Sequence, residues 1–364
     1  MKSKKCLVSF GLAVLLIIAF ILPGCAGVAT DNNADEVVVR QQDPEYRLKM
    51  QHSWGAAENH FYEEYARAVE AMSGGRIVIE VFSEGELVDY DEIPDAVSSG
   101  LLDIGHTHPS YNIGLLDEGY LEYVPFLWRN TDELMAALWH YGIADLTKEA
   151  IEEAFDVVVL DFQIADPAGL LFSKPVYSIN DMAGMTVNIE PPLAYMLEDL
   201  VGIKAIYYDA EDLWYNVQMG IIDGLEYGGF KAMSDMDLHT AAVGGGVSGQ
   251  GSFVLPYFVI GWYPYYCINP SLWEELPQDL QAILIEATHA NTVWMRSYYA
   301  YHEIQSKTIM QEAGIGITNL PEDEVELIFE KTLEWLENDF APKSPRTQKL
   351  YEAVMEALKD FGRI

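Results

Sequence analysis

Cysteine is scarce in this chain, which has three among its 364 residues. Cys6 lies in an apolar N-terminal segment and Cys25 closely follows that segment, so Cys267 stands alone in the remainder. A lone cysteine excludes an intrachain disulfide and leaves too few ligands for a zinc cluster. Cys267 belongs to an apolar, aromatic run, where a buried and unreactive thiol is expected.

Positive charge is scarce as well. The chain has 21 lysines and arginines against 57 aspartates and glutamates, which gives a net charge of −36. Such a surface repels phosphate backbones and argues against nucleic-acid binding. The same charge keeps an exported protein soluble, but it does not identify a solute.

Common catalytic signatures are missing too. The sequence has no Gly-x-Ser-x-Gly nucleophile elbow, no His-Glu-x-x-His zinc motif and no cysteine–histidine arrangement. Paired carboxylates are frequent in a chain this acidic, so their presence identifies no active site. We therefore expect no enzyme activity, and an exported α/β hydrolase is the alternative that the sequence leaves open.

The N-terminus predicts export and a lipid anchor. Three lysines precede an apolar run from about Cys6 to Leu22, a pattern typical of an export signal. The Leu-Pro-Gly-Cys that follows resembles the lipobox of bacterial lipoproteins, with Cys25 as the lipidated residue. An uncleaved transmembrane anchor is the alternative, because the run approaches membrane-spanning length. Both place the folded part in the periplasm or at the cell surface, attached to the membrane.

Strands and helices alternate from Tyr46 onward. Short β-branched and aromatic runs are separated by segments of helical periodicity, such as the stripe of Phe61, Tyr65 and Val69. This alternation predicts an α/β fold built from βα units, with mostly parallel strands and helices on both faces. After Pro277 the pattern is almost wholly helical.

Two distant segments repeat one pattern. Ala96–Thr107 (AVSSGLLDIGHT) and Asn216–Tyr227 (NVQMGIIDGLEY) share Val, Gly, two aliphatic residues and Asp at the same spacing. In each, a helix is expected to end at the glycine and a strand to follow. The repeat predicts two similar lobes. Because ligands of open α/β sheets bind beyond the carboxyl ends of strands, the aligned residues His106 and Glu226 are expected to face each other across a cleft.

An ordered series of segments resembles the DctP family, the extracytoplasmic solute receptors of tripartite ATP-independent periplasmic (TRAP) transporters. The series runs through RLKMQHSWGAAENHFYEEY, DAVSSGLLDIGHTHPSY, INDMAGMTVNI, NVQMGIIDGLEY and INPSLWEELPQDL. DAVSSGLLDIGHT is most similar to the branch associated with 2-oxo acids and lactate, some of whose members hold a metal ion with the ligand. The resemblance implies a two-lobed periplasmic-binding-protein-like fold, with a ligand cleft between the lobes and a long C-terminal helix bracing both.

The resemblance also implies an organisation and a mode of action. The lobes are expected to close by a hinge motion on a small organic acid, and the closed receptor to dock on TRAP permease subunits in the membrane. A homodimer is left open. The expected segments are 1–25 as lipoprotein signal peptide, 26–45 as flexible tether, 46–165 plus about 252–290 as lobe I, 166–251 plus about 291–340 as lobe II, and 341–364 as a C-terminal helical extension.

One departure from the family changes the expected chemistry. The segment matching DMAGMTVNIEPP usually carries an arginine that clamps the solute carboxylate, and Asn188 stands there instead. An arginine suits that task because it is always charged and binds carboxylates in a bidentate way. Three substitutes stay open: a calcium or sodium ion held by Glu226 with Asp166 or Gln163, a neutral or aromatic solute, or a cationic solute attracted by Glu226 and aromatic faces.

The candidate solute contacts lie mainly at strand ends and in the loops that follow them. His106 and His108 are two residues apart, so both can point to one side of an extended strand. Two histidines without a third ligand make a weak metal site, so His106 is expected either to contact a solute or to support the loop that does. The predicted set comprises Trp54, His106, Tyr111, Gln163, Asp166, Asn188, Glu226 and Tyr227, with Glu226 as the metal ligand.

Overall fold

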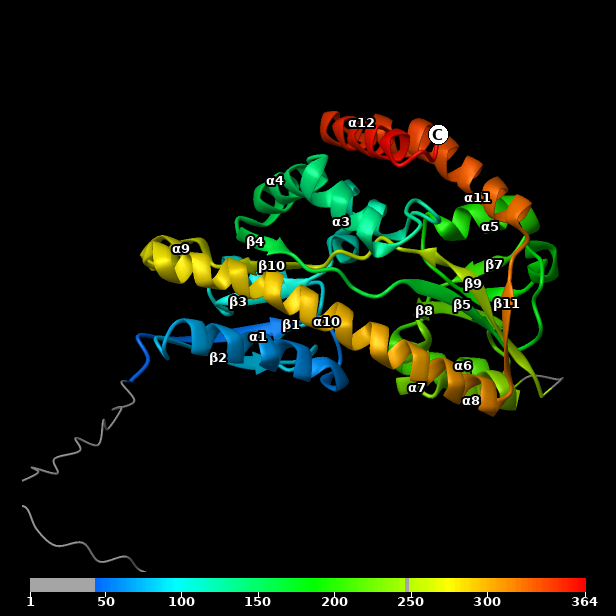
Figure 1. The fold of residues 1–364 in the computed structure, drawn as a ribbon, viewed down its shortest axis with the longest axis horizontal. Helices are drawn as coiled ribbons and strands as arrows, with labels where there is room; N and C mark the ends of the chain where they lie inside the picture. Colours follow the sequence, from blue (N-terminus) through cyan, green and yellow to red (C-terminus); the bar gives the residue numbers. More distant parts are fainter. Residues whose placement is uncertain (1–42, 246–248) are drawn as a thin grey trace, which may run out of the picture. The chain divides into compact units, whose positions relative to one another are not determined.

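The structure, a computed structural model, describes residues 43–245 and 249–364. The export signal, Cys25 and nearly all of the tether lie outside these described residues. Within them the chain forms an α/β fold with two separate sheets, which confirms the predicted fold class (Figure 1). We call the five-stranded sheet with its helices lobe I, and the six-stranded sheet with its helices lobe II.

Lobe I has the strand order β2-β1-β3-β10-β4, with β10 antiparallel to both of its neighbours and β1 parallel to β2 and β3. The alternation of short apolar runs and amphipathic segments thus folds as predicted. Its elements are β1 (Tyr46–His52), η1 (Ala56–Glu58), α1 (Asn59–Met72), β2 (Ile77–Phe82), α2 (Ile93–Ser98), β3 (Ile104–Thr107), η2 (Pro109–Asn112), η3 (Asp117–Tyr123), α3 (Thr131–His140), α4 (Ile143–Phe155), β4 (Val158–Phe162) and β10 (Tyr265–Ile268).

Lobe II has the strand order β11-β9-β5-β8-β6-β7, with β5 antiparallel to both of its neighbours. The other pairings in this sheet are parallel. Its elements are β5 (Ala168–Phe172), η4 (Ile179–Met182), β6 (Thr186–Asn188), α5 (Leu193–Val201), β7 (Lys204–Ile206), α6 (Ala210–Gln218), β8 (Gly224–Gly228), α7 (Phe230–Asp235), α8 (Leu238–Gly245), β9 (Gly251–Val259) and β11 (Ile315–Asn319).

The position of β9 corrects one expected boundary. We expected the chain to return to lobe I at about residue 252, but β9 (Gly251–Val259) pairs with β5 and β11 in the sheet of lobe II. The strand has partners on both sides there, so its backbone groups are satisfied inside that sheet. The return to lobe I comes after Val259.

Two short segments connect the sheets, and we call them the crossing segments. Residues 163–167 lead from β4 to β5, and residues 260–264 lead from β9 to β10. Backbone hydrogen bonds tie the two segments together, from Gln163 N to Pro264 O at 2.7 Å and from Ala165 N to Trp262 O at 3.2 Å. Two paired connecting segments between the sheets are suited to act as a hinge.

Helices near the C-terminus span both lobes. After α9 (Pro270–Glu275), the long helix α10 (Gln278–Ala313) contacts α1 and β4 in lobe I and α7 and β11 in lobe II (Figure 1). This confirms the predicted bracing helix. Helix α11 (Glu322–Trp335) packs on α5, and the chain then passes through η5 (Leu336–Phe340) and η6 (Ala341–Lys343) to α12 (Pro345–Asp360).

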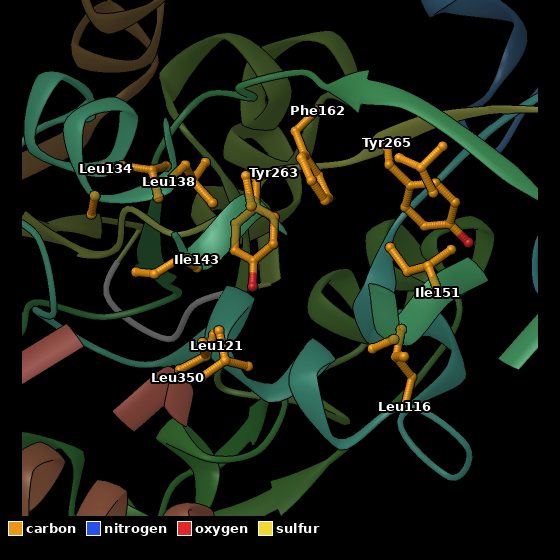
Figure 2. Close-up of a cluster of buried hydrophobic side chains, with 14 of the residues drawn as sticks. Leu116, Leu121, Leu134, Leu138, Ile143, Ile151, Phe162, Tyr263, Tyr265 and Leu350 are labelled. Atoms are coloured by element: carbon orange, nitrogen blue, oxygen red, sulfur yellow. The ribbon is translucent and has the colours of Figure 1, made fainter. Parts of the chain in front are cut away.

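The last helix belongs to the core of lobe I. Leu350 of α12 lies in one buried apolar cluster with Phe162 of β4, Tyr263 of a crossing segment and Tyr265 of β10. Figure 2 shows these side chains with leucines and isoleucines from α3, α4 and η3. The end of the second crossing segment is therefore anchored on the lobe I side by well-packed aromatic rings.

The repeat seen in the sequence is a structural repeat. Gly100 and Gly220 both have the left-handed backbone that the helix ends require, with φ of 78° and 66°. Each following aspartate binds the neighbouring strand: Asp103 accepts from Lys49 N at 2.7 Å, and Asp223 accepts from Thr186 N at 2.9 Å. The same helix–glycine–strand unit therefore occupies the same place in each lobe.

Replacing either aspartate by alanine is expected to lower the free energy of unfolding by about 1–2 kcal/mol, because a strand N–H then loses a charged acceptor. Denaturant unfolding of Asp103→Ala and Asp223→Ala measures this effect. Glu70→Ala, an exposed position on α1, is the control with no expected change. Two variants that both match the control would contradict this role.

Candidate solute-binding site

The crossing segments and the ends of β3, β6 and β8 bring most of the predicted residues together. Gln163 and Asp166 lie on the first crossing segment, Asn188 ends β6, and Glu226 lies in β8. These four side chains are almost fully buried, with relative exposures between 0% and 7%. Polar groups this buried need partners, so the partners of each one indicate what it can do.

Glu226 has an oxygen without a partner. Its Oε1 is buried and has no hydrogen bond among the described residues. Burial, followed by the charges of Glu190 and Asp166, raises the pKa of Glu226 well above its usual range. An unpaired carboxylate in such surroundings is costly when ionised, and a cation arriving beside it would remove that cost.

Two further carboxylates share this environment. Burial, and then Glu303, raises the pKa of Asp166 to about 8, although its Oδ2 accepts a hydrogen bond from Gly229 N at 3.3 Å. Burial, and then Glu122, raises the pKa of Glu190 to about 7, while a hydrogen bond with Tyr123 works in the opposite direction. Glu190 was missed in the sequence, where its only signal is its place two residues after Asn188.

Basic side chains are absent from this group of carboxylates. Among the described residues, no lysine or arginine acts on Glu226 or Glu190. The nearby lysines pair elsewhere, Lys174 with Asp223 and Lys231 with Asp235. The part of the chain that the structure describes therefore offers no cationic clamp for a carboxylate at Glu226.

Asn188 binds its own lobe. Its Oδ1 accepts a hydrogen bond from Tyr208 N at 2.7 Å, which fastens the segment after β7 to the end of β6. An asparagine engaged in this way cannot take over the bidentate grip of an arginine. Contact between its Nδ2 group and a solute stays a prediction.

Aromatic side chains come from both lobes. Tyr111 of lobe I packs against the rings of Tyr90 and His108, with 4.8 Å between ring centroids in both cases. Burial, and then Glu190 and Tyr227 of lobe II, raises the pKa of Tyr111 well above its ordinary value. Groups of lobe II therefore act electrostatically on Tyr111 of lobe I.

His106 is enclosed within lobe I. Its Nδ1 lies 3.2 Å from the hydroxyl of Tyr62, and its Nε2 lies 2.9 Å from Oε1 of Gln163. Gln163 in turn donates through Nε2 to Tyr266 and Asn291. Both ring nitrogens of His106 are thus used inside the lobe, and no interaction with Glu226 is found among the described residues. His106 supports Gln163, and contact with a solute stays a prediction.

The predicted pair of histidines separates into two networks. His106 and His108 have ring centroids 6.4 Å apart, and His108 bonds Trp54 and Glu122 instead of Tyr62 and Gln163. In the described ranges, no three His, Cys, Asp or Glu side chains lie close enough together to hold a metal ion. The His-x-His segment is therefore part of the lobe I interior.

A calcium or sodium ion fits Glu226 in one respect. Its partnerless buried oxygen is the kind of hard anionic ligand that both ions prefer. Glu226 would hold the ion with its carboxylate, and Asp166 of the crossing segment could supply a second one. Oxygens of the solute would have to complete the coordination sphere.

Two surface hollows lie away from these residues. One is lined by Glu63, Arg67 and Ile79, and the other by Tyr177, Gly251 and Ile315, with their neighbours in each case. Neither includes a predicted contact. Gln163, Asp166, Asn188 and Glu226 are almost fully buried, whereas Trp54, Tyr111 and Tyr227 are half-buried.

Two α/β lobes joined by paired crossing segments are the architecture of a two-lobed solute-binding protein. Residues 50–343 match the family described as bacterial extracellular solute-binding protein, family 7 (DctP). The chain belongs to this family, whose members are the receptors of TRAP transporters. The family consists of periplasmic substrate-binding proteins and not of enzymes. No helix in the described part of the chain is both long and apolar enough to cross a membrane.

Individual relatives support this assignment. A monocarboxylate 2-oxoacid-binding periplasmic protein of a Nostoc species is 27% identical over 270 residues, which cover 71% of this chain and 69% of the relative. A TRAP solute-binding protein of Colwellia psychrerythraea, solved with calcium and pyruvate, has a TM-score of 0.75 at 23% identity and covers 87% of this chain and 95% of its own. One of Chromohalobacter salexigens, solved with (S)-(+)-2-amino-1-propanol, has a TM-score of 0.76 at 20% identity and covers 88% and 98%.

Proposed function

We propose that this TRAP receptor closes its lobes on a small organic acid accompanied by a calcium or sodium ion, which bridges the acid to Glu226. The observation that carries the proposal is the buried, partnerless Oε1 of Glu226 among further carboxylates. When these carboxylates are ionised, they repel a carboxylate solute unless a positive charge comes with it. The Colwellia protein, solved with calcium and pyruvate, is a precedent in the same fold.

Closure would take place about the crossing segments. Lobe I would comprise residues 46–162 with 265–268 and the helices packed on them, and lobe II residues 168–259 with 315–319. Tyr111 and Trp54 would close one side of the solute, and Tyr227, Asn188 and Glu226 the other. The closed form would be the one that the permease recognises. Cys25 would carry the lipid that holds the receptor at the membrane.

Binding of the ion should release protons. Burial raises the pKa of Glu226 well above its usual range in the ligand-free protein, which favours the protonated form, whereas a metal ligand must be deprotonated. Ion and acid are therefore expected to bind together, since each removes the electrostatic penalty of the other.

A thermal-shift screen tests the proposal. Small 2-oxo and 2-hydroxy acids are expected to raise the melting temperature only with calcium or sodium present. The gain corresponds to about 2.7 kcal/mol at a hundredfold excess over Kd. Chelation of calcium in a sodium-free buffer is the matched control and should abolish the shift. Acids that stabilise the receptor equally without any ion would contradict the bridging role.

One observation favours a second candidate, a small cationic amine. The described residues lack a group of three metal-binding side chains, and an ammonium group needs only hydrogen-bond acceptors and aromatic faces. The Chromohalobacter protein was solved with an amino alcohol. In the same screen, this candidate predicts stabilisation by amines that persists in chelator.

A further inference from the structure

A buried hydrogen-bonded chain joins Trp54, His108 and Glu122 in lobe I. The indole Nε1–H of Trp54 donates to Nε2 of His108 at 2.9 Å, and Nδ1 of His108 lies 3.0 Å from Oε1 of Glu122. His108 is 4% exposed and Glu122 is fully buried. An indole nitrogen can only donate, so Nε2 must be free of hydrogen. The ring proton therefore sits on Nδ1, where the carboxylate accepts it.

Backbone groups hold the carboxylate end of this chain. Oε2 of Glu122 accepts from Ser110 N at 3.0 Å, and Oε1 accepts from Tyr263 N at 2.8 Å. Ser110 belongs to η2, and Tyr263 to the second crossing segment. A carboxylate with donors from separate elements keeps one orientation, and a fixed carboxylate fixes the tautomer of the histidine bound to it.

Trp54 remains partly exposed although its only polar atom is used. Its ring packs edge-on against His106, with 5.5 Å between centroids, and against Tyr62, with 6.0 Å. A side chain with no free donor has only its apolar ring surface left to offer.

We propose that Glu122 and His108 are positioning residues, which hold Trp54 so that it meets the solute with its ring face and not with its N–H. The inference rests on the proposed function, because it takes Trp54 as part of the solute site. In this arrangement the Trp54 ring selects solutes by their shape and by stacking. Solutes with a planar or apolar part should be favoured over solutes that need a hydrogen-bond donor here.

The hydrogen-bonded chain can be tested without any solute. In protein carrying ¹⁵N-tryptophan, the signal lost in Trp54→Phe identifies the Trp54 indole. This signal is expected downfield, with slow solvent exchange. His108→Phe removes the acceptor and should move the signal upfield and speed its exchange at least about tenfold. His108→Gln supplies a carbonyl acceptor and should restore both properties. An indole signal that is the same in all three proteins would overturn the chain.

Affinity for a solute identified in the screen tests the positioning. Trp54→Phe keeps a ring face and should bind within about threefold of wild type, whereas Trp54→Ala should lose about tenfold. His108→Phe should also weaken binding, and His108→Gln should recover it. If Trp54→Phe is as weak as Trp54→Ala, the N–H is the contact and the inference fails. If no solute binds the wild type, the proposed function fails, and the indole signal still decides the hydrogen-bonded chain.

Discussion

Glu226→Gln is expected to stabilise the ligand-free receptor and to abolish its ion-dependent binding of organic acids. The raised pKa of Glu226 means that folding disfavours the ionised form that the unfolded chain adopts near pH 8, and an amide cannot ionise, so the free energy of unfolding there should rise by about 1–3 kcal/mol. The same change removes the anionic ligand of the bridging ion. Affinity for the acid in the presence of calcium should fall at least about a hundredfold.

Denaturant unfolding and calorimetric titration measure the two effects on one protein. Glu80→Gln, an exposed position on β2, removes the same charge outside the site and serves as the matched control. A functional carboxylate is indicated if stability rises while affinity falls. Loss of a structural carboxylate would lower both. A destabilised variant with unchanged affinity would refute the assignment of Glu226.

The ligand-free receptor is expected to lose stability as the pH rises from 6.5 to 8. Asp166 has a pKa of about 8 in the folded protein and an ordinary value of 3.8, so in this window it is protonated when folded and ionised when unfolded. Unfolding then releases a proton, and a rising pH favours the unfolded state. At about 1.4 kcal/mol per pH unit, Asp166 alone accounts for about 2 kcal/mol.

Other groups define the limits of this window. Glu190 and Glu58, with pKa values of about 7, act in the same direction over its lower part. His52 acts in the opposite direction below pH 6.5 and lowers stability as the pH falls. Burial lowers its pKa to about 4, so the unfolded histidine takes up a proton that the folded one does not. Because three carboxyls outweigh one histidine, stability is expected to keep rising as the pH falls through 6.

Denaturant titrations at several pH values in chelator measure this slope. Asp166→Asn should flatten it by about 2 kcal/mol between pH 6.5 and 8. An unchanged slope in Asp166→Asn would show that this carboxyl is ionised in the folded protein.

The repeated helix–glycine–strand unit could be predicted because it is local. The left-handed glycine, the apolar pair and the aspartate act within a dozen residues, so the pattern in the sequence carries the structure. We also predicted that His106 and Glu226 face each other across a cleft, but the described residues show no interaction between them. Alignment placed both on equivalent strands, but His106 bonds Tyr62 of α1 and Gln163 of a crossing segment, whereas Glu226 keeps a buried oxygen without a partner.

Strand β9 and Glu190 likewise depend on tertiary contacts that local sequence patterns do not predict. An apolar run such as Gly251–Val259 fits either sheet, and only its pairing with β5 and β11 assigns it to lobe II. Glu190 follows a strand end like many other acidic residues, and only its closeness to Glu122 and Glu226 distinguishes it.

The sequence by itself determined the family, the two lobes, the bracing helix and the missing carboxylate clamp, because these depend on local patterns and on residue identity. The tertiary structure decided which buried polar groups are paired. Trp54 and His108 are 54 residues apart and His108 and Glu122 are 14 apart, yet they form one hydrogen-bonded chain, while Glu226 keeps an oxygen without a partner. Hydrogen bonds require approach within about 3 Å, and for distant residues that approach is set by how the elements pack.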